Sequence, residues 1–118
     1  MSERRSILVV EDEPLIAMML EDFLETLGHR VHASCDSVEG AIGEADKGGF
    51  DMAIIDVNLG GETAWPLARK LREKRIPFVI ATGGHVEPPP AEFADVPMIE
   101  KPYTVDRVSP AIEAALAG

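Results

Sequence analysis

Short apolar runs alternate with stretches of helical periodicity along the chain. The runs lie near 7–10, 31–34, 52–55, 78–81 and 97–99. The first, third and fourth contain no alternating polar residues, which is typical of parallel strands covered on both faces of a sheet. The β-α-β-α-β order therefore predicts a doubly wound α/β fold. In such a fold, ligands bind outside the carboxyl ends of the strands.

The first two predicted helices have recognisable ends. Pro14 suits the first turn of one helix, because its missing N–H costs nothing there, and Gly28 is a plausible terminator. The second helix is expected to begin at Asp36 or Ser37. Glu39 is placed for a capping box from Asp36.

The later part of the chain is less regular. Pro66 falls in the first turn of a third predicted helix, and Pro110 lies inside a fourth, which predicts a late start or a kink. The apolar stripe of the fourth predicted helix is Val105, Val108, Ile112 and Leu116. Glycines and prolines break up the segment 83–97, so we expect a mobile loop with at most one helical turn at 91–94. A helix between the last two strands would then be short or disordered.

Polar residues end four of the five apolar runs. Glu11 and Asp12 follow the first run, Asp56 the third, Thr82 the fourth and Lys101 the last. The carboxyl ends of parallel strands meet at one edge of a sheet, so these side chains are expected to form one site. Carboxylates for a hard cation, a nucleophilic carboxylate, a hydroxyl and a fixed cation together are typical of phosphoryl transfer onto an aspartate.

A magnesium ion needs only one or two carboxylates beside its waters and a phosphate oxygen. Asp12 and Asp56 fit as direct ligands, and Glu11 fits as a carboxylate acting through water. Clustered carboxylates repel one another, which is expected to raise their pKa values in the metal-free protein. The alternative is that Glu11, Asp12 and Glu13 only cap the first helix, whose N-terminus favours acids.

The other site residues also have simpler interpretations. Asp56 can attack phosphorus, or it can be a turn residue; Thr82 can donate to a phosphoryl oxygen, or it can be an ordinary strand-end hydroxyl. Lys101 can pair first with Asp56 and then with the phosphoryl group, whereas a lone strand-end lysine is usually solvated. Pro102 favours a constrained bond, which can be cis before proline, that directs the lysine inward.

Composition narrows the classes of function. With 118 residues the chain is expected to be a single domain over 1–118, without an output domain. The formal net charge of −10 argues against a nucleic-acid partner. Cys35 is the single cysteine, which predicts a reducing, cytoplasmic location. The apolar run before Glu11 is too short for a signal peptide or a membrane span, so no membrane association is expected.

These motifs together resemble the receiver domain of bacterial two-component response regulators. The matching pieces are Val9-Val10-Glu11-Asp12-Glu13-Pro14, Ile54-Ile55-Asp56-Val57-Asn58-Leu59, Ala81-Thr82-Gly83 and Glu100-Lys101-Pro102. The resemblance implies a flavodoxin-like receiver fold with five parallel strands in the order 2-1-3-4-5.

The resemblance also implies the roles of the site residues. Asp56 would accept a phosphoryl group, with Mg²⁺ held by Asp12, Asp56 and the backbone carbonyl of Asn58. Thr82 and Lys101 would form the response pair. The donor would be a histidine kinase, of the HWE or a related type, or a histidine phosphotransfer protein. The signal would leave by contact with an unidentified protein target or by phosphotransfer.

Two departures from the family pattern involve the switch. The aromatic residue usual three positions before the lysine is replaced by Met98. The stretch 77–84 resembles a stand-alone subgroup with a Pro-Phe-x-Phe-Ala-Thr-Gly-Tyr signature, in which Ile80 and Gly84 replace the second Phe and the Tyr.

Two further classes compete with a phosphorylated response regulator. One is a receiver-like binding module that acts without phosphate, against which the set Asp12, Asp56, Thr82 and Lys101 argues. The other is a Mg²⁺-dependent phosphohydrolase. Such enzymes usually carry an Asp-x-Asp nucleophile on the first strand, where this chain has Glu11-Asp12-Glu13. We therefore expect a phosphoacceptor that assists its own phosphorylation and dephosphorylation, not a turnover enzyme.

Overall fold

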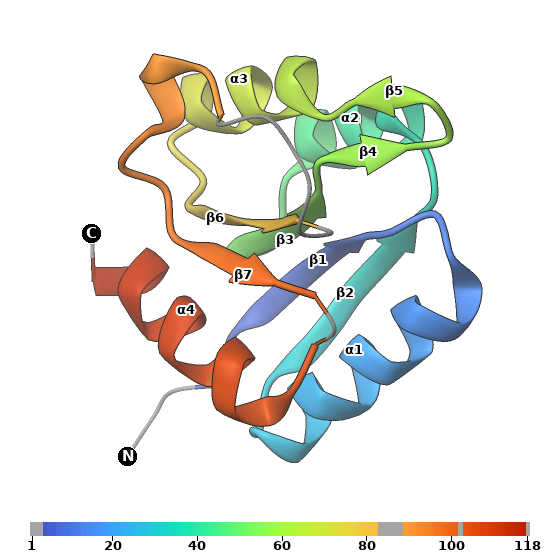
Figure 1. Cartoon of the computed structure of the whole chain (residues 1–118), viewed down its shortest axis with the longest axis vertical. Helices are drawn as coiled ribbons and strands as arrows, with labels where there is room; N and C mark the ends of the chain where they lie inside the picture. The colour runs from blue at the N-terminus through green and yellow to red at the C-terminus, as the bar shows by residue number, and fades with distance from the viewer. Residues whose placement is uncertain (1–3, 83–88, 102, 118) are drawn as a thin grey trace.

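The computed structural model describes residues 4–82, 89–101 and 103–117. Five parallel strands form one sheet in the order β2-β1-β3-β6-β7 (Figure 1). These strands are β1 (Ser6–Val10), β2 (Arg30–Cys35), β3 (Met52–Asp56), β6 (Phe78–Thr82) and β7 (Met98–Glu100). In chain order this is 2-1-3-4-5, so the predicted doubly wound sheet and its strand order are confirmed.

Four helices cover the two faces of the sheet. Helices α1 (Pro14–Thr26) and α4 (Val105–Ala117) lie on one face, and α2 (Val38–Lys47) and α3 (Trp65–Glu73) lie on the other (Figure 1). Neighbouring residues of a strand point to opposite faces. On β3, Met52 and Ile54 therefore pack in the core under α1 and α4, whereas Ala53 and Ile55 pack under α2 and α3. Burial on both faces explains why β1, β3 and β6 are almost wholly apolar.

The ends of the helices follow the expected residues with one correction. Pro14 opens α1, and Gly28 follows its C-cap with φ 88°. The capping box expected from Asp36 is wrong, because α2 begins at Val38 and its N-cap is therefore Ser37. The Ser37 hydroxyl accepts a hydrogen bond from the Gly40 N–H at 3.1 Å.

The predictions for the irregular parts of the chain, the last helix and the segment 83–97, have different outcomes. Helix α4 begins at Val105 and continues past Pro110, so a late start is ruled out. Between β6 and β7 the described residues contain only a short 3₁₀ helix, η1 (Ala91–Phe93), which agrees with a single expected helical turn. The mobile loop predicted within 83–97 falls partly on residues 83–88, which lie outside the described residues, and so does the Pro102 bond.

A small hairpin after β3 was not predicted. It consists of β4 (Asn58–Leu59) and β5 (Glu62–Thr63), which pair antiparallel. Gly60 and Gly61 connect them with φ values of 58° and 89°. Two consecutive residues with positive φ define the tight turn that suits a two-residue hairpin, and glycine adopts it without strain. The Gly-Gly pair was the signal available in the sequence.

Within the described ranges, we find no helix with the length and apolar character needed to cross a membrane.

Candidate functional site at the carboxyl edge of the sheet

The parallel register brings the strand-end residues to one edge of the sheet. Val10 of β1 lies beside Ile55 of β3, so Glu11 and Asp56 come next on adjacent strands. Asp56 lies beside Ala81 of β6, one residue before Thr82. The backbone N–H of Lys101 donates to the Thr82 carbonyl at 2.8 Å, which continues the row to β7. Residues widely separated in sequence are therefore neighbours because of strand order.

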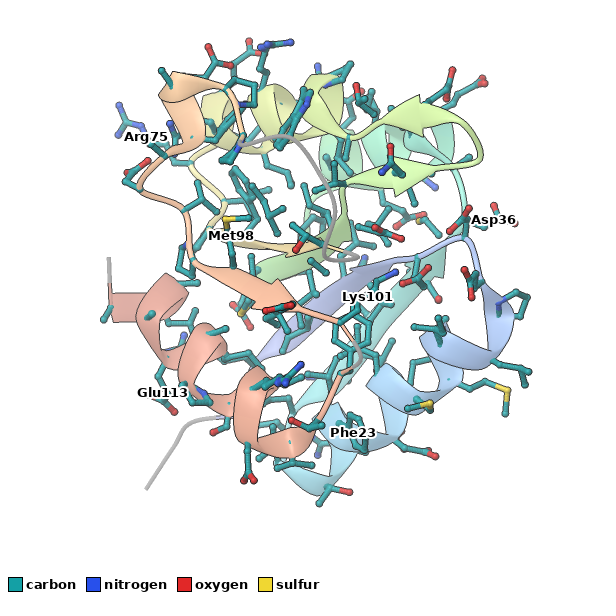
Figure 2. The ribbon with its side chains drawn as sticks, viewed as in Figure 1. Phe23, Asp36, Arg75, Met98, Lys101 and Glu113 are labelled. Carbon is teal, nitrogen blue, oxygen red and sulfur yellow. The ribbon has the colours of Figure 1, made fainter. Side chains whose placement is uncertain are left out.

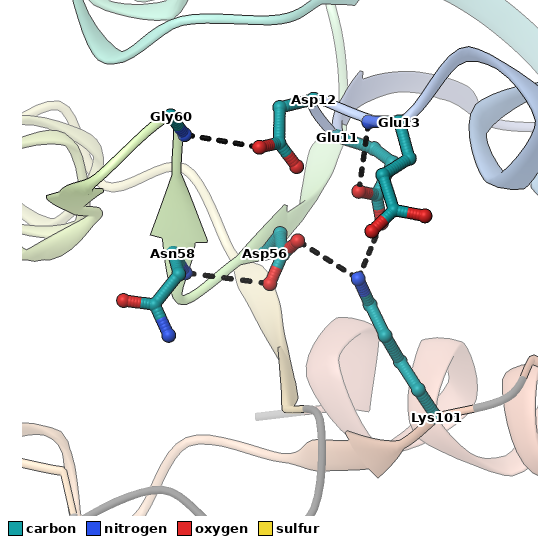
Figure 3. A network of polar contacts seen from close by, with 7 residues as sticks. All are labelled: Glu11, Asp12, Glu13, Asp56, Asn58, Gly60 and Lys101. Atoms are coloured by element: carbon teal, nitrogen blue, oxygen red, sulfur yellow. Dashed lines mark hydrogen bonds and ion pairs between the residues drawn. The ribbon is translucent and has the colours of Figure 1, made fainter.

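Lys101 is the centre of a polar network shown in Figure 3. Its Nζ lies 2.7 Å from Glu11 Oε1 and 2.8 Å from Asp56 Oδ2. The side chains are 16%, 0% and 9% exposed, respectively. One cation thus faces two carboxylates in a place where water screens poorly, and charge-assisted hydrogen bonds are strong there.

The charges of this network shift the pKa values of its members. Burial raises the pKa of Glu11 from 4.5 to about 7, and the nearby Asp56 charge adds to the rise, while the hydrogen bond to Lys101 opposes it. Burial alone would lower the pKa of Lys101, but its hydrogen bonds to Asp56 and Glu11 outweigh burial, so the net direction is upward. The pKa of Glu11 is thus raised as expected, but mainly by burial, and repulsion from the neighbouring carboxylate adds less.

The raised pKa of Glu11 predicts an unusual pH dependence of stability without metal. Between pH 4.5 and about 7 the folded state binds a proton at Glu11 that the unfolded state has released. The free energy of unfolding should therefore fall as pH rises through this window, by about 3 kcal/mol, and level off above it. Urea denaturation at several pH values in EDTA measures this.

The control for this prediction is Glu11→Gln, which should lose the downward slope. Wild type and variant must be compared directly, because burial lowers the pKa of His29 and this gives the opposite slope near pH 6.5. Identical pH profiles for the two proteins would contradict a raised pKa at Glu11.

The acidic run after β1 does more than cap α1. The Glu13 side chain makes no capping hydrogen bond, although Glu13 is the N-cap residue. Glu11 Oε2 accepts from the Glu13 N–H at 3.2 Å, and Asp12 Oδ2 accepts from the Gly60 N–H at 3.0 Å. Asp12 therefore connects β1 to the unpredicted hairpin. These contacts argue against the alternative that the three acids only cap α1.

The hairpin also orients Asn58 toward Asp56. The Ala64 N–H donates to the Val57 carbonyl at 2.8 Å, and the next pair of the ladder is Asn58 with Thr63. In an antiparallel ladder, hydrogen-bonded pairs alternate with non-hydrogen-bonded pairs, so the Asn58 N–H is free to point out of the hairpin. This N–H donates to Asp56 Oδ1 at 3.3 Å.

The donor set fits a hard divalent cation. Glu11, Asp12 and Asp56 each offer a carboxylate oxygen, and these oxygens all lie within 4.8 Å of one another. These three carboxylates supply only oxygen ligands, which are the ligands that Mg²⁺ prefers. A cation there would also offset the repulsion between the carboxylates.

Two residues at the rim complete the description. Met98 lies on the edge strand β7 beside Ile80 and is 45% exposed, so it is not part of the carboxylate network (Figure 2). Tyr103, which sequence reasoning did not single out, is 2% exposed, and its ring centroid lies 5.9 Å from Lys101 Nζ. Burial raises its pKa, and its hydroxyl has no hydrogen-bond partner within the described part of the chain. The sequence signal that could have identified Tyr103 was an aromatic residue two positions after Lys101, where its ring can pack beside the lysine.

Comparison with known protein families assigns the chain to the class that its fold and site indicate. The family model for the response regulator receiver domain matches residues 7–113. The chain therefore belongs to the response regulator receiver domain family, whose members are signalling modules.

Among solved structures, the chain is similar to SdrG from Sphingomonas melonis Fr1. The solution structure of SdrG gives a TM-score of 0.86 at 50% identity, and the match covers 98% of this chain and 99% of SdrG. The BeF₃-activated conformation of SdrG from Pseudomonas melonis Fr1 gives a TM-score of 0.81 at 51% identity, over 94% of this chain and 95% of that one.

Longer regulators contain similar domains. The uncharacterized transcriptional regulatory protein YkoG of Bacillus subtilis (strain 168) is 30% identical over 97% of this chain. The sensor protein EvgS of Escherichia coli (strain K12) is 35% identical over 61% of it. The chain spans only 52% of YkoG and 6% of EvgS.

Proposed function

We propose that this receiver domain accepts a phosphoryl group on Asp56 from a phosphohistidine, in a Mg²⁺-dependent reaction. The donor would be a histidine kinase, of the HWE or a related type, or a histidine phosphotransfer protein. The N–P bond of the donor breaks as the Asp56 carboxylate oxygen forms the new O–P bond, and the imidazole leaves with the bonding electrons.

One observation carries this proposal. The buried carboxylate of Asp56 contacts a cation, Lys101, at 2.8 Å, next to two further carboxylates that can hold a metal. Glu11 and Asp56 together compensate Lys101 before transfer. Afterwards the phosphoryl group would add roughly −1.5 to −2 charges, and the Lys101 ammonium can pair with it.

Each other residue has a role in this scheme. Asp12, Asp56 and the Asn58 carbonyl would hold Mg²⁺, with Glu11 acting through water; the ion would neutralise the phosphoryl oxygens during transfer. The Thr82 hydroxyl would donate to a phosphoryl oxygen. The Lys101 N–H is bonded to the Thr82 carbonyl, so the two residues respond together.

The donor would dock on the apolar surface of α1 beside the site. Leu15 is 76% exposed, Met18 60% and Met19 43%, although large apolar side chains are usually buried. These side chains follow directly after the acidic run at the carboxyl edge. A helical donor with an apolar stripe would cover them while its phosphohistidine reaches Asp56.

This docking surface can be tested separately from the chemistry. Met18→Asp should slow phosphotransfer from a phosphorylated histidine kinase by at least about tenfold, because a charge replaces an apolar contact. Its labelling by acetyl phosphate should equal that of wild type, and Met18→Leu should behave as wild type with both donors. Equal slowing of both reactions would instead indicate damage to the site.

The output would be a phosphorylation-dependent protein contact or onward phosphotransfer in a cytoplasmic phosphorelay. We propose that the chain acts as a single receiver domain and that movement of Thr82 and Lys101 toward the phosphoryl group reshapes the surface at β7 and α4. Met98 would occupy the switch position on that surface. A BeF₃-activated conformation is described for SdrG, which is 51% identical to this chain, and this supports a response to activation here.

The deciding experiment is intact-mass analysis after incubation with Mg²⁺ and acetyl phosphate. A gain of one phosphoryl group that needs Mg²⁺ supports the proposal. No gain with acetyl phosphate or with a phosphorylated kinase, despite measured Mg²⁺ binding, would favour a binding module that acts without phosphate. Release of phosphate from small esters over many turnovers would favour a phosphohydrolase.

A further inference from the structure

Helices α1 and α3 end in the same turn but with different residues. In α1, the Gly28 N–H donates to the Glu25 carbonyl at 3.0 Å and the His29 N–H to the Leu24 carbonyl at 2.9 Å. In α3, the Arg75 and Ile76 N–H groups bond to the Arg72 and Leu71 carbonyls at 3.0 and 2.9 Å. Glycine is the residue that this turn favours, because the position after the C-cap has positive φ.

Arg75 adopts that left-handed conformation, with φ 59°, although its Cβ makes it unfavourable. Among the described residues, every other residue with positive φ is a glycine. The turn itself therefore does not explain the arginine. Residues held in such a conformation are often found at functional sites, so the surroundings of the Arg75 side chain are informative.

Arg75 adjoins a groove of about 410 Å³ at the amino ends of β6 and β7. Most of the lining is apolar, and it includes Ile76, Pro77, Phe78, Val96, Pro97 and Ala114. Figure 2 shows Arg75 at the outer edge of the molecule, far from Lys101. The groove thus lies at the opposite end of the strands from the phosphoryl site.

The two arginines of the groove differ in their contacts. Arg72 donates to the Glu92 carbonyl, lies 3.4 Å from Asp95 Oδ1 and stacks over Phe93 at 5.1 Å, so it is engaged in holding η1 against α3. The Arg75 guanidinium has no ion pair or hydrogen bond to the described residues. A cation without a partner beside an apolar groove is notable in a chain of net charge −10.

We propose that this groove binds a peptide segment of a partner protein that carries a single carboxylate next to apolar side chains. A carboxylate can form a bidentate pair with the Arg75 guanidinium, and the apolar side chains would cover the groove floor. The formal charges of Arg72, Arg75 and Asp95 leave one positive charge to compensate. A strongly acidic partner would be repelled by the rest of the surface.

The composition of the groove favours a peptide over a small polar metabolite. Sites for polar metabolites need several convergent polar groups. The polar side chains of this lining are Arg72, Arg75 and Asp95, and the first and third contact each other. One free cation and an apolar floor match a short segment with one Asp, Glu or terminal carboxylate.

The test uses a phage library of random heptapeptides, selected on the full chain. Recovered peptides are synthesised and titrated into ¹⁵N-labelled protein. We expect sequences that pair one carboxylate with apolar residues, and amide shift changes at Arg75, Ile76, Val96 and Ala114. The affinity should fall at least tenfold when the peptide carboxylate is changed to an amide, and equally in Arg75→Gly.

Three variants keep this test specific. Arg75→Gly should fold at least as stably as wild type, because glycine suits the turn, and should be labelled normally by acetyl phosphate. Lys47→Gln removes one positive charge from an exposed site on α2 and should bind the peptides as wild type does. Ala114 lines the groove and is exposed, so Ala114→Glu should weaken peptide binding while Arg75 itself is unchanged.

Three results would overturn the proposal. One is that no peptide is enriched over selection on Arg75→Gly. Another is that enriched peptides perturb residues outside the groove. The third is that sedimentation shows a wild-type dimer which Arg75→Gly dissociates, since the groove would then bind a second copy of the chain. All three readouts are independent of phosphorylation at Asp56.

Discussion

Asp56→Asn is expected to abolish labelling by acetyl phosphate, from about one phosphoryl group per chain to none detectable. The substitution keeps the size of the side chain and an oxygen that can accept from the Asn58 N–H, now 3.3 Å away. It removes the carboxylate nucleophile. It also removes a negative charge beside Glu11, so the free energy of unfolding should be equal or higher. Intact mass and urea denaturation of the same sample measure both effects.

Asp36→Asn is the matched control for this substitution. Asp36 also follows a strand of the sheet, β2, but it is exposed and lies apart from the carboxylate network (Figure 2). It should be labelled as wild type is. If Asp56→Asn were still labelled while folded, the acceptor would be a different residue and the proposed mechanism would be wrong.

The architecture of the sheet was predictable because its signals are local. Apolar runs without alternation require burial on both faces, and helical stretches between them require parallel strands. The order of the strands came from the resemblance, since no local pattern decides which strands are neighbours. That order is what places Glu11 beside Asp56 and brings Lys101 within 3 Å of both.

What sequence reasoning missed depends on backbone conformation. The hairpin at 58–63 is too short for a periodic pattern, and it gives Asp12 its partner, Gly60. The left-handed conformation of Arg75 contradicts residue preference, so no propensity argument could predict it. Of the two expected starts of α2, Ser37 is the N-cap, and the capping box from Asp36 fails because a helix boundary one residue later changes which side chain reaches the free N–H groups.

The surroundings of Glu11 also became visible only in three dimensions. As a residue acting through water on a metal, it would be expected to be solvated. It is instead 2% exposed, bonded to the Glu13 N–H and paired with Lys101. A buried carboxylate of this kind depends on its cation, because an unpaired charge in the interior is costly.

Lys101→Met is therefore expected to destabilise the metal-free protein by about 3 kcal/mol at pH 8. The variant leaves Glu11 and Asp56 facing each other, nearly buried and without their cation. Lowering the pH to 5.5 should recover much of the loss, because Glu11 can then take up a proton. Mg²⁺ should also recover stability, and more in the variant than in wild type, because the ion supplies the missing positive charge.

Lys70→Met provides the comparison that separates this effect from ordinary loss of a lysine. Lys70 Nζ lies 3.2 Å from Asp46 Oδ1, but the two side chains are 33% and 53% exposed. Such a surface pair contributes no more than about 1 kcal/mol, with little dependence on pH or Mg²⁺. Urea denaturation of both variants at pH 8 and 5.5, with EDTA or Mg²⁺, provides the measurement. Equal losses in the two variants would mean that Lys101 stabilises the site no more than a surface charge does, and its place between Glu11 and Asp56 would then need another explanation.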